Sequence, residues 1–396
     1  MALIVQKFGG TSVGSIDRIE AVARRVINAH QQGHQVVVVV SAMSGETNRL
    51  LGLAKQIDEV PMARELDVLL SAGEQVSMAL LAMAINKQGF AATSMTADQV
   101  GITTRGGFNN AEIDKISTES IQSLLDNGHI VIVAGFQGRD NQGNITTLGR
   151  GGSDASAVAL ASALKADECQ IFTDVDGVYT TDPRIEPQAR RLDVVDFETM
   201  TTLARLGAKV LQLQSVEYAY QHQVPLRVLS SFEDDRTTQG TLVQMKSDNQ
   251  TSIAGIAVLA NQHLFSLASQ AEKMIWQSGG IASQLWNNVM DETNSSHVVV
   301  SDADLAQLKL AHSDELHHID NVATLSVVGN AATECEQAML ATLAGEGIVV
   351  HKVQHLPQCL CLLVAESDHK RAVKLLHAQF VVAGLSEHEP ELLAVS

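Results

Sequence analysis

Short apolar runs separated by helical patterns recur through the first 250 residues of the chain. The runs are apolar on both faces, as is typical of strands in a covered parallel sheet. Between them, apolar residues recur at the three- and four-residue spacing of helices. This alternation predicts a mainly parallel, doubly wound α/β domain with ligands at the carboxyl ends of its strands. The predicted strands are residues 3–5, 36–40, 130–134, 170–172 and 226–229, and the predicted helices include 19–27, 68–85 and 155–164.

The chain after residue 250 follows a shorter pattern, which predicts two small α+β modules. A polar stretch at 245–251 precedes them and has the composition of a linker. We therefore divide the chain into a first domain at 1–244, one module at 252–320 and a second module at 321–396. The modules are predicted to contain strands 252–258, 263–267, 297–300, 323–328, 348–355 and 359–364 and helices 280–289, 334–343 and 367–379, with a turn between the first two strands.

Composition excludes several classes of protein. The formal net charge is −18, which argues against a nucleic acid partner, because phosphate backbones require a concentrated basic surface. The apolar run at 78–85 is far shorter than the roughly 18 residues that span a bilayer, so we expect no membrane segment. The four cysteines form no CxxC pair and show no metal-ligand spacing, which favours a reducing cytoplasm.

Three loops that follow predicted strands carry residues suited to binding a nucleotide. In the first, Lys7, Gly9 and Gly10 stand between a strand and a helix, where glycine amides and a lysine could hold phosphate oxygens. The GxxxxGK[ST] pattern of the P-loop is absent. An exposed lysine beside an ordinary glycine turn is the alternative interpretation of this loop.

The other two loops lie at 146–154 and 172–184. In the second loop, Arg150 could form a two-point clamp on a carboxylate or phosphate, whereas Ser153 and Asp154 could act simply as helix caps. The third loop is dense in carboxylates and hydroxyls, which suit Mg²⁺ bound through water or a ribose, or make an ordinary acidic turn. Because all three loops follow strands of one predicted domain, a shared site is favoured.

Five segments together resemble the aspartate kinases of the amino acid kinase family, in that family's order. The resemblance implies a mainly parallel sheet of about eight strands between helices, followed by paired ACT regulatory modules. It also implies an enzyme that uses ATP and Mg²⁺ to phosphorylate the β-carboxylate of L-aspartate, as the first step towards lysine, threonine, methionine or an aspartate-derived osmolyte. The segments are KFGGTS at 7–12, VSAM at 40–43, SAGE at 71–74, TTLGRGGSD at 146–154 and TDVDGVYTTDPR at 173–184.

Site residues follow from the resemblance, motif by motif. Lys7 and Asp154 are implied as the catalytic residues, and Arg150 is expected to bind the α-carboxylate of aspartate. The implied substrate-binding residues are Ser41, Thr47, Glu74, Arg150, Gly151, Gly152 and Ser153. The implied nucleotide-binding residues are Lys7, Gly9, Gly10, Thr11, Thr173, Asp174, Tyr179, Arg184, Lys209 and Val210, and no protein metal ligand is implied.

The chain departs from the family pattern at three places. Gln212 and Leu213 stand where the family usually has His-Pro. The Pro-Asp-x-Pro-Gly turn that receives an effector has no counterpart between residues 266 and 280, and residues 329–332 lack the family's Gly-Met-Arg. The first module is therefore predicted to be degenerate, and the modules to form a homodimer or a larger assembly through their open sheet edges.

The chemistry is consistent with this interpretation. A carboxylate acceptor is already ionised at neutral pH, so its phosphorylation requires positioning and relief of charge repulsion rather than a general base. Glu74 could pair with a free α-ammonium group, which favours aspartate over an N-acetylated substrate. Two alternatives stay open: an amino acid kinase that acts on glutamate or a related carboxylate, and an amino-acid-sensing binding protein with weak catalysis.

Overall fold

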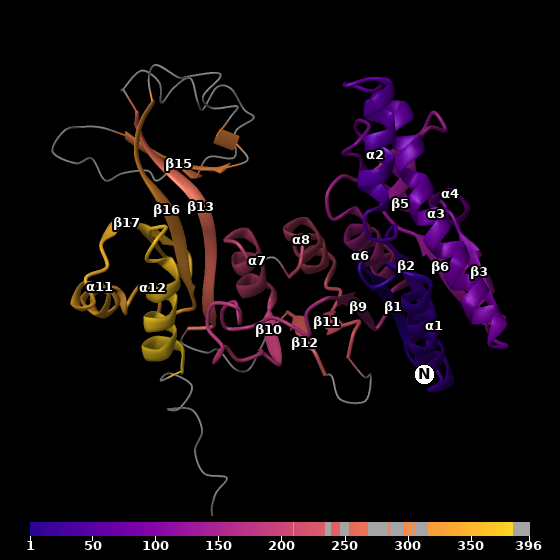
Figure 1. Cartoon of the computed structure of the whole chain (residues 1–396). Helices are drawn as coiled ribbons and strands as arrows, with labels where there is room; N and C mark the ends of the chain where they lie inside the picture. Colours follow the sequence, from indigo (N-terminus) through magenta and orange to yellow (C-terminus); the bar gives the residue numbers. More distant parts are fainter. Residues whose placement is uncertain are drawn as a thin grey trace, which may run out of the picture. The chain divides into compact units, whose positions relative to one another are not determined.

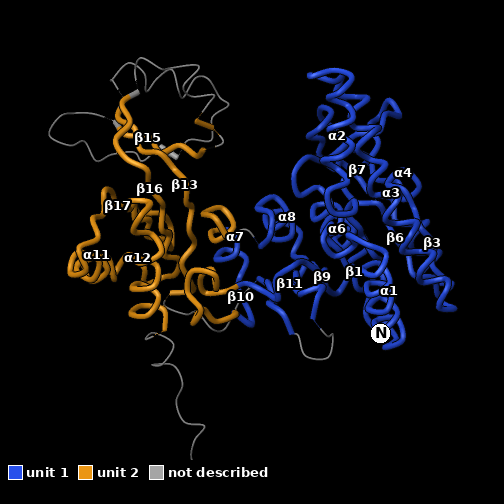
Figure 2. The backbone as a smooth tube through the Cα atoms, viewed as in Figure 1, with its two compact units in different colours: residues 1–178, 192–201, 210–247 blue, residues 179–191, 202–209, 248–396 orange. Residues whose placement is uncertain are grey.

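The computed structural model describes residues 1–208, 210–233, 239–245, 253–267, 284–285, 296–302, 304–305 and 316–382 (Figure 1). They form two compact units, of which unit 1 comprises residues 1–178, 192–201 and 210–247 and unit 2 comprises 179–191, 202–209 and 248–396 (Figure 2). The division predicted from the sequence, at 1–244, 252–320 and 321–396, differs from these units because it places 179–191 and 202–209 in the first domain.

Unit 1 is built on an eight-stranded sheet in the order β10-β12-β11-β9-β1-β2-β6-β3. Every neighbouring pair is parallel except β11 and β12, so the predicted mainly parallel α/β fold is confirmed. The central strands are continuous apolar runs because both of their faces are covered. The strands are β1 Leu3–Phe8, β2 Gln35–Val40, β3 Ala92–Met95, β6 Ile130–Ala134, β9 Glu168–Thr173, β10 Val194–Asp196, β11 Leu226–Ser230 and β12 Thr241–Gln244.

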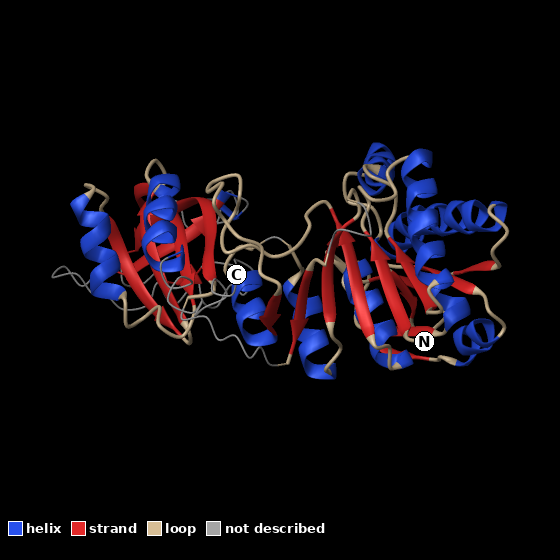
Figure 3. Ribbon diagram, turned by 90° about the horizontal axis from the view of Figure 1, so that it is seen from below, coloured by secondary structure: helices blue, strands red, loops and turns tan. Residues whose placement is uncertain are grey.

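Helices cover both faces of this sheet (Figure 3). One face packs on α1 (Ile16–Gln31) and α3 (Ala63–Lys87) in a core that includes Phe8 of β1. The opposite face packs on α6 (Gly152–Leu164). Since side chains alternate along a strand, Lys7 points to the α6 face while Phe8 points to the α1 face. The remaining helices are α2 Glu46–Ile57, α4 Ala97–Val100, α5 Glu119–Asp126, α7 Phe197–Arg205 and α8 Leu213–His222.

A smaller sheet in unit 1 supports the second glycine-rich loop. Its strand order is β5-β4-β7-β8, and β8 leads directly into the segment that precedes α6. The side chain of Asp140 accepts bonds from the amides of Gln142 and Asn144, which closes the turn between the last two strands. The strands are β4 Ile102–Arg105, β5 Glu112–Ile116, β7 Gln137–Arg139 and β8 Ile145–Thr147.

Helix α3 is long and apolar enough to cross a membrane by length and composition alone. Its buried residues include Leu81 and Ile85, which belong to the core beneath the sheet. They also include two carboxyl side chains, Asp67 and Glu74, which are placed among protein groups. We therefore assign α3 as a core helix of unit 1, since core helices pass the same length and composition test.

Unit 2 contains a six-stranded antiparallel sheet in the order β14-β15-β13-β16-β18-β17. The two strands predicted at 252–258 and 263–267 are one strand, because the polar residues between them form a bulge at Asn261, with φ 56°, rather than a turn. Gln284 and Leu285, inside the predicted helix at 280–289, are strand, and the rest of that segment lies outside the described residues. The strands are β13 Gly255–Leu267, β14 Gln284–Leu285, β15 Ser296–Ser301, β16 Leu316–Val328, β17 Val350–Leu356 and β18 Cys359–Ala365.

The two predicted modules share this sheet. Strand β16 crosses the predicted boundary at 320/321 and pairs with β13 on one side and β18 on the other. Its apolar side chains, among them Leu325 and Val327, pack in one core with the helices that follow. These helices are α11 Glu336–Gly345, α12 His369–Leu376 and the π-helix η1 His377–Val382.

Candidate active site

The first glycine-rich loop connects β1 to α1. The amide of Gly9 donates to the carbonyl of Phe172 at 3.2 Å, so it joins the loop to β9 instead of facing a ligand. A Cβ on Gly10 would lie 2.9 Å from the carbonyl oxygen of Ala42, which explains why only glycine fits there. Within the described backbone the amides of Gly10 and Thr11 donate to no other group. These two amides are therefore the ones that can meet an anion.

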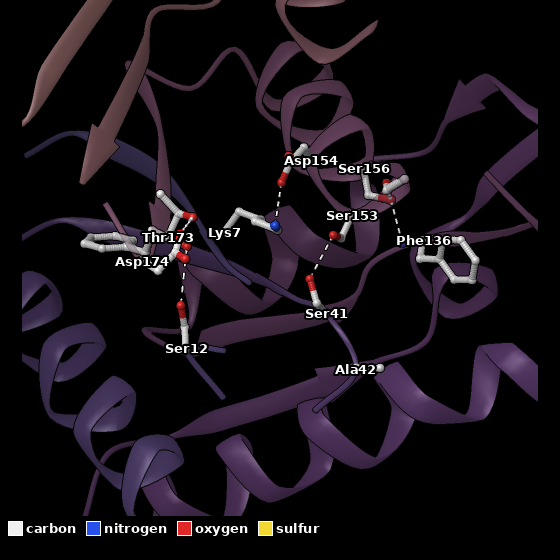
Figure 4. Close-up of polar contacts among 12 residues, drawn as sticks. Lys7, Ser12, Ser41, Ala42, Phe136, Ser153, Asp154, Ser156, Thr173 and Asp174 are labelled. Carbon is white, nitrogen blue, oxygen red and sulfur yellow. Dashed lines mark hydrogen bonds and ion pairs between the residues drawn. The ribbon is translucent and has the colours of Figure 1, made fainter. Parts of the chain in front are cut away.

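A buried ion pair lies beside this loop. Lys7 Nζ is 2.5 Å from Asp154 Oδ1, and the two side chains are 10% and 11% exposed (Figure 4). An exposed lysine was the alternative interpretation of this loop, and that interpretation is wrong. Strand β1 lies between β2 and β9, and α6 covers one of its faces, so the side chains on that face, including Lys7, are enclosed. The structure thus brings together the two residues expected to be catalytic.

A second polar contact lies at the start of α6. Ser41 Oγ, at the end of β2, is 2.8 Å from Ser153 Oγ (Figure 4). Neither Ser153 nor Asp154 caps the helix, because the N-cap is Gly151 in a left-handed conformation, with φ 73°, and no side chain caps it. Both side chains are therefore directed to the site instead of to the helix backbone.

Ser156 fixes the next turn of α6. Its hydroxyl accepts a bond from the amide of Phe136 at 3.0 Å and donates to the carbonyl of Gly152 at 2.8 Å. A Cβ on Gly135 would lie 2.9 Å from the Cβ of Ser153, so the end of β6 approaches the helix closely. The N-terminal turn of α6 is thereby held against the ends of two strands, β2 and β6.

The Gln-Leu departure from the family pattern lies against the second loop. A Cβ on Gly151 would lie 2.5 Å from Cγ of Gln212, which is the N-cap of α8. Arg150, one residue earlier, is exposed, and so is Thr47 in the first turn of α2. Among the described residues no other side chain forms a hydrogen bond or ion pair with Arg150. The position of its guanidinium group is therefore set by the backbone of its loop.

Glu74 is a buried carboxyl group of α3 beside the end of β2. It is 4% exposed, and its Oε1 accepts a bond from the amide of Ala42 at 3.0 Å. Its Oε2 has no partner among the described residues. Burial raises the pKa of Glu74 to about 7, because a charged carboxylate loses its hydration there. Ala42 follows Ser41, so Glu74 lies next to the contact between Ser41 and Ser153.

Two more predicted nucleotide residues, Thr173 and Asp174, lie at the end of β9. Thr173 Oγ1 donates to Asp174 Oδ1 at 3.1 Å. The carbonyl of Thr173 accepts bonds from the amide and hydroxyl of Ser231, and Ser12 Oγ is 2.8 Å from Ser231 Oγ. This serine pair, absent from the predicted site, ties the first loop to β9 and β11.

Four further nucleotide residues were predicted beyond residue 178. Tyr179 and Arg184 belong to unit 2, where Tyr179 forms a β-bridge with Arg191 and Arg184 pairs with Asp182 at 2.7 Å. Val210 lies in a turn before α8, in unit 1. Lys209 lies outside the described residues. Their nucleotide contacts stay predictions.

Asp67 is the functional candidate that the sequence analysis missed. It is fully buried on α3, seven residues before Glu74, and its carboxylate accepts bonds from three donors: the amide of Asn109 and the amide and hydroxyl of Thr147. Asp67 stands one residue before the helix predicted at 68–85, and α3 begins earlier, at Ala63, so the helix prediction did not include it. Buried carboxylates need partners, so such a position indicates a specific contact.

A parallel sheet with a glycine-rich loop, a buried lysine–aspartate pair and polar side chains at its carboxyl edge is a phosphate-handling arrangement. Residues 2–230 match the Amino acid kinase family, and the chain belongs to that family. Within it, the chain groups with the aspartate kinases, as the five sequence segments suggested. An aspartate kinase of Stutzerimonas stutzeri is 43% identical over 96% of this chain and 97% of its own length.

Other relatives and solved structures agree. An aspartate kinase of Pseudomonas putida is 60% identical over 65% of this chain, and the match spans 62% of that relative's length. Aspartokinase III of E. coli, solved in complex with aspartate and ADP, superposes with a TM-score of 0.77 at 26% identity. That superposition covers 95% of this chain and 99% of the E. coli chain.

Proposed function

We propose that this chain transfers the γ-phosphate of ATP to the β-carboxylate of L-aspartate, giving 4-phospho-L-aspartate. The observation that carries the proposal is the buried pair of Lys7 and Asp154, 2.5 Å apart at the carboxyl edge of the sheet. A cation fixed at that edge lies where an acceptor carboxylate and a phosphoryl group would repel each other. The product is the first intermediate of aspartate-derived amino acid biosynthesis, or of an aspartate-derived osmolyte.

The residues divide the work without a general base. Asp154 holds the ammonium group of Lys7 in place, and the amides of Gly10 and Thr11 offer donors to phosphate oxygens. Ser41 and Ser153 offer hydroxyls to the acceptor. Because the acceptor is ionised at neutral pH, alignment and charge compensation are what the site supplies.

Recognition of the amino acid rests on Glu74 and Arg150. Oε2 of Glu74 is buried and has no partner in the described part of the chain, so an α-ammonium group would satisfy it. An N-acylated substrate would leave that carboxyl group unpaired. Arg150 is exposed at the tip of its loop and can form a two-point contact with the α-carboxylate. These two groups favour a free α-amino acid.

Mg²⁺ is part of the proposal and is carried by the nucleotide. Asp154 is already engaged by Lys7, and among the described residues no group of three or more His, Cys, Asp and Glu side chains converges. Mg²⁺ binds phosphate oxygens readily and keeps several waters, so Asp174 at the end of β9 suits a contact through water. When bound, the ion neutralises charge on the transferring phosphate.

Hydroxylamine trapping of the acyl phosphate tests the proposed function. The protein is incubated with ATP, Mg²⁺ and a panel of amino acids, and the hydroxamate formed is measured. We expect aspartyl hydroxamate from L-aspartate. Hydroxamate from glutamate alone would instead support a different amino acid kinase, and none from any acceptor would support an amino-acid-sensing binding protein.

Arg150→Lys is expected to raise the KM for aspartate by about tenfold and to change kcat little. A lysine is a point charge that cannot reproduce the planar two-point contact of a guanidinium, and such a contact is worth roughly 1.4 kcal/mol or more. Steady-state kinetics with each substrate varied in turn measures the change. Arg105→Lys, at an exposed arginine of β4, is the matched control. Unchanged saturation by aspartate would mean that Arg150 points elsewhere.

The assembly is proposed to be a homodimer or larger, held through residues 252–396. In the six-stranded sheet, β17 is an edge strand, and Val349 beside it is 65% exposed. Open edges tend to be paired or covered, and a second copy is the simplest partner. Light scattering at micromolar concentration is expected to give at least twice the mass of one chain. A stable monomer would refute this proposal.

A cytoplasmic location completes the proposal. The reaction uses ATP, and all four cysteines are free thiols. Cys169, Cys359 and Cys361 are buried, as is typical of proteins kept in a reducing compartment. Cell fractionation with a tagged chain tests the location, and recovery in the periplasmic fraction would contradict it.

A further inference from the structure

Asp67 is a fully buried carboxylate that the proposed reaction does not use directly. Its oxygens accept bonds from the amide of Asn109 at 3.0 and 3.1 Å, from the amide of Thr147 at 2.8 Å and from the hydroxyl of Thr147 at 2.7 Å. All three donors are neutral, and within the described ranges no cationic side chain forms an ion pair with Asp67. A buried carboxylate held in this way organises the chain around it.

The donors belong to two segments that close around Asp67. The amide of Ala111 donates to the carbonyl of Thr147 at 2.9 Å, which joins the segments directly. Gly149 is left-handed, with φ 73°, and a Cβ there would lie 2.7 Å from Oδ1 of Asn110. Residues 109–111 and 147–149 are therefore packed too closely to move independently.

Arg150 depends on this arrangement. It follows Thr147 by three residues and is exposed, so the backbone of the loop sets its direction. The chain beyond it has its own supports, because Ser153 contacts Ser41 and the hydroxyl of Ser156 contacts Phe136. Loss of the Asp67 contacts would thus loosen the loop that carries Arg150 while leaving α6 in place.

The same face of α3 carries Glu74. Positions 67, 71 and 74 are spaced four and three residues apart, so they share one side of the helix. Ser71 adds a further tie, since its carbonyl accepts a bond from Nε2 of Gln137 at 2.9 Å. Helix α3 therefore carries Glu74 itself and, through Asp67, also holds the loop that carries Arg150.

We propose that Asp67 is a positioning residue that fixes Arg150 relative to Glu74, and with it the distance between the groups that hold the α-carboxylate and α-ammonium of the acceptor. The inference rests on the proposed function for the identity of that acceptor. An amino acid anchored by its α-groups reaches the phosphoryl group only with a side chain of one length. Asp67 therefore contributes to the choice of aspartate over glutamate, which is one methylene longer.

Asp67→Asn tests the proposal by placing an amide NH₂ among hydrogen-bond donors without changing shape. We expect the KM for aspartate to rise about tenfold or more, the KM for ATP to stay within about twofold and kcat within about threefold. The preference for aspartate over glutamate in kcat/KM should fall. Thr147→Val removes one donor only and should raise the KM for aspartate by roughly threefold, which keeps the test available should the first variant fold poorly.

Ser77→Ala is the matched control. Ser77 is fully buried on the same helix, but its hydroxyl bonds to the carbonyl of Gly73 and does not reach the loop. This variant should leave every kinetic constant within about twofold of the parent. An increase in the KM for aspartate equal to that of Asp67→Asn would mean that α3 responds to any buried change, and would overturn the proposal.

Amide hydrogen exchange separates this proposal from the proposed function, because it needs no substrate. Asp67→Asn should speed exchange in peptides that cover residues 107–112 and 145–151, and leave peptides from α6 unchanged. Unchanged exchange in the first two peptides, a uniform rise across unit 1, or a KM for aspartate within twofold of the parent would each overturn the role of Asp67. Absence of any hydroxamate from the parent would overturn the proposed function alone.

Discussion

Lys7→Ala is expected to lower kcat by about a hundredfold or more. The ammonium group lies at the carboxyl edge of the sheet, where negative charge gathers as a phosphoryl group approaches a carboxylate, and a preorganised donor there is worth roughly 3 kcal/mol of transition-state stabilisation. Steady-state kinetics at saturating ATP and aspartate measures the loss. A variant within threefold of the parent would contradict the catalytic role of Lys7.

The burial of Lys7 requires a second variant, because alanine leaves Asp154 as a buried, unpaired carboxylate. Breaking a buried pair in this way destabilises a fold by about 3 kcal/mol. The double variant Lys7→Ala with Asp154→Asn removes the unpaired charge, so its melting temperature should recover while kcat stays low. Recovery of kcat would show a purely structural role. Lys87→Ala, at an exposed lysine paired with Glu20, is the control for removal of a lysine.

Glu74→Gln is expected to weaken aspartate binding and to stabilise the fold at alkaline pH. Oε2 of Glu74 is the free buried acceptor proposed for the α-ammonium group, so its loss should raise the KM for aspartate by about a hundredfold. The KM for ATP should change little, because Glu74 forms its hydrogen bond with the amide of Ala42 and none with a predicted nucleotide residue. Substrate titrations measure both constants.

The effect on stability follows from the pKa of Glu74, which burial raises from 4.5 to about 7. A raised pKa means that the fold favours the protonated form, so this contribution is fully present below pH 4.5 and is lost as pH rises through 7. At pH 8 the ionised group costs the fold about 3 kcal/mol. A glutamine cannot ionise, so the variant should melt higher than the parent at pH 8 and like it at pH 5.

The control for this pH dependence is Glu65→Gln, at an exposed glutamate in the first turn of the same helix. It should shift the melting temperature equally at both pH values, because an exposed carboxylate keeps its hydration in the fold. An equal shift for Glu74→Gln at pH 5 and pH 8 would show that Glu74 is not the titrating group.

The strands of unit 1 could be predicted from the sequence because a strand buried on both faces is an uninterrupted run of apolar residues. Residues 36–40 are all valine, and β2 consists of them and Gln35. Strand β13 left no such mark, since the polar residues around Asn261 are typical of a turn as well as of a bulge. The bulge is decided by pairing with β16, about 60 residues away, and not by local sequence.

The site residues were predicted from motifs, but their environments depend on contacts between distant residues. Lys7 is enclosed by α6 and paired with Asp154, so its local sequence alone could not show that it is buried. The contact between Ser41 and Ser153 likewise spans 112 residues. Asp67 belongs to no motif considered, and its partners come from two separate segments. Residue types indicated the chemistry, whereas burial and partners required the fold.

Unit 2 contains two segments from the middle of the chain, 179–191 and 202–209, and this limits how the C-terminal part can be gained or lost in evolution. The chain passes between the units at 178/179, 191/192, 201/202, 209/210 and 247/248. Thr180, in the first of the inserted segments, accepts a bond from the amide of Ile256 at 2.7 Å, and its hydroxyl is 2.8 Å from Nε2 of His377. In a domain that was added to a chain end at a single point, the chain would pass between the two units only once. Loss of the residues after 250 would therefore remove the hydrogen-bond partners of segment 179–191 in unit 2. Exchange of the C-terminal sheet for another would require matching substitutions in that segment.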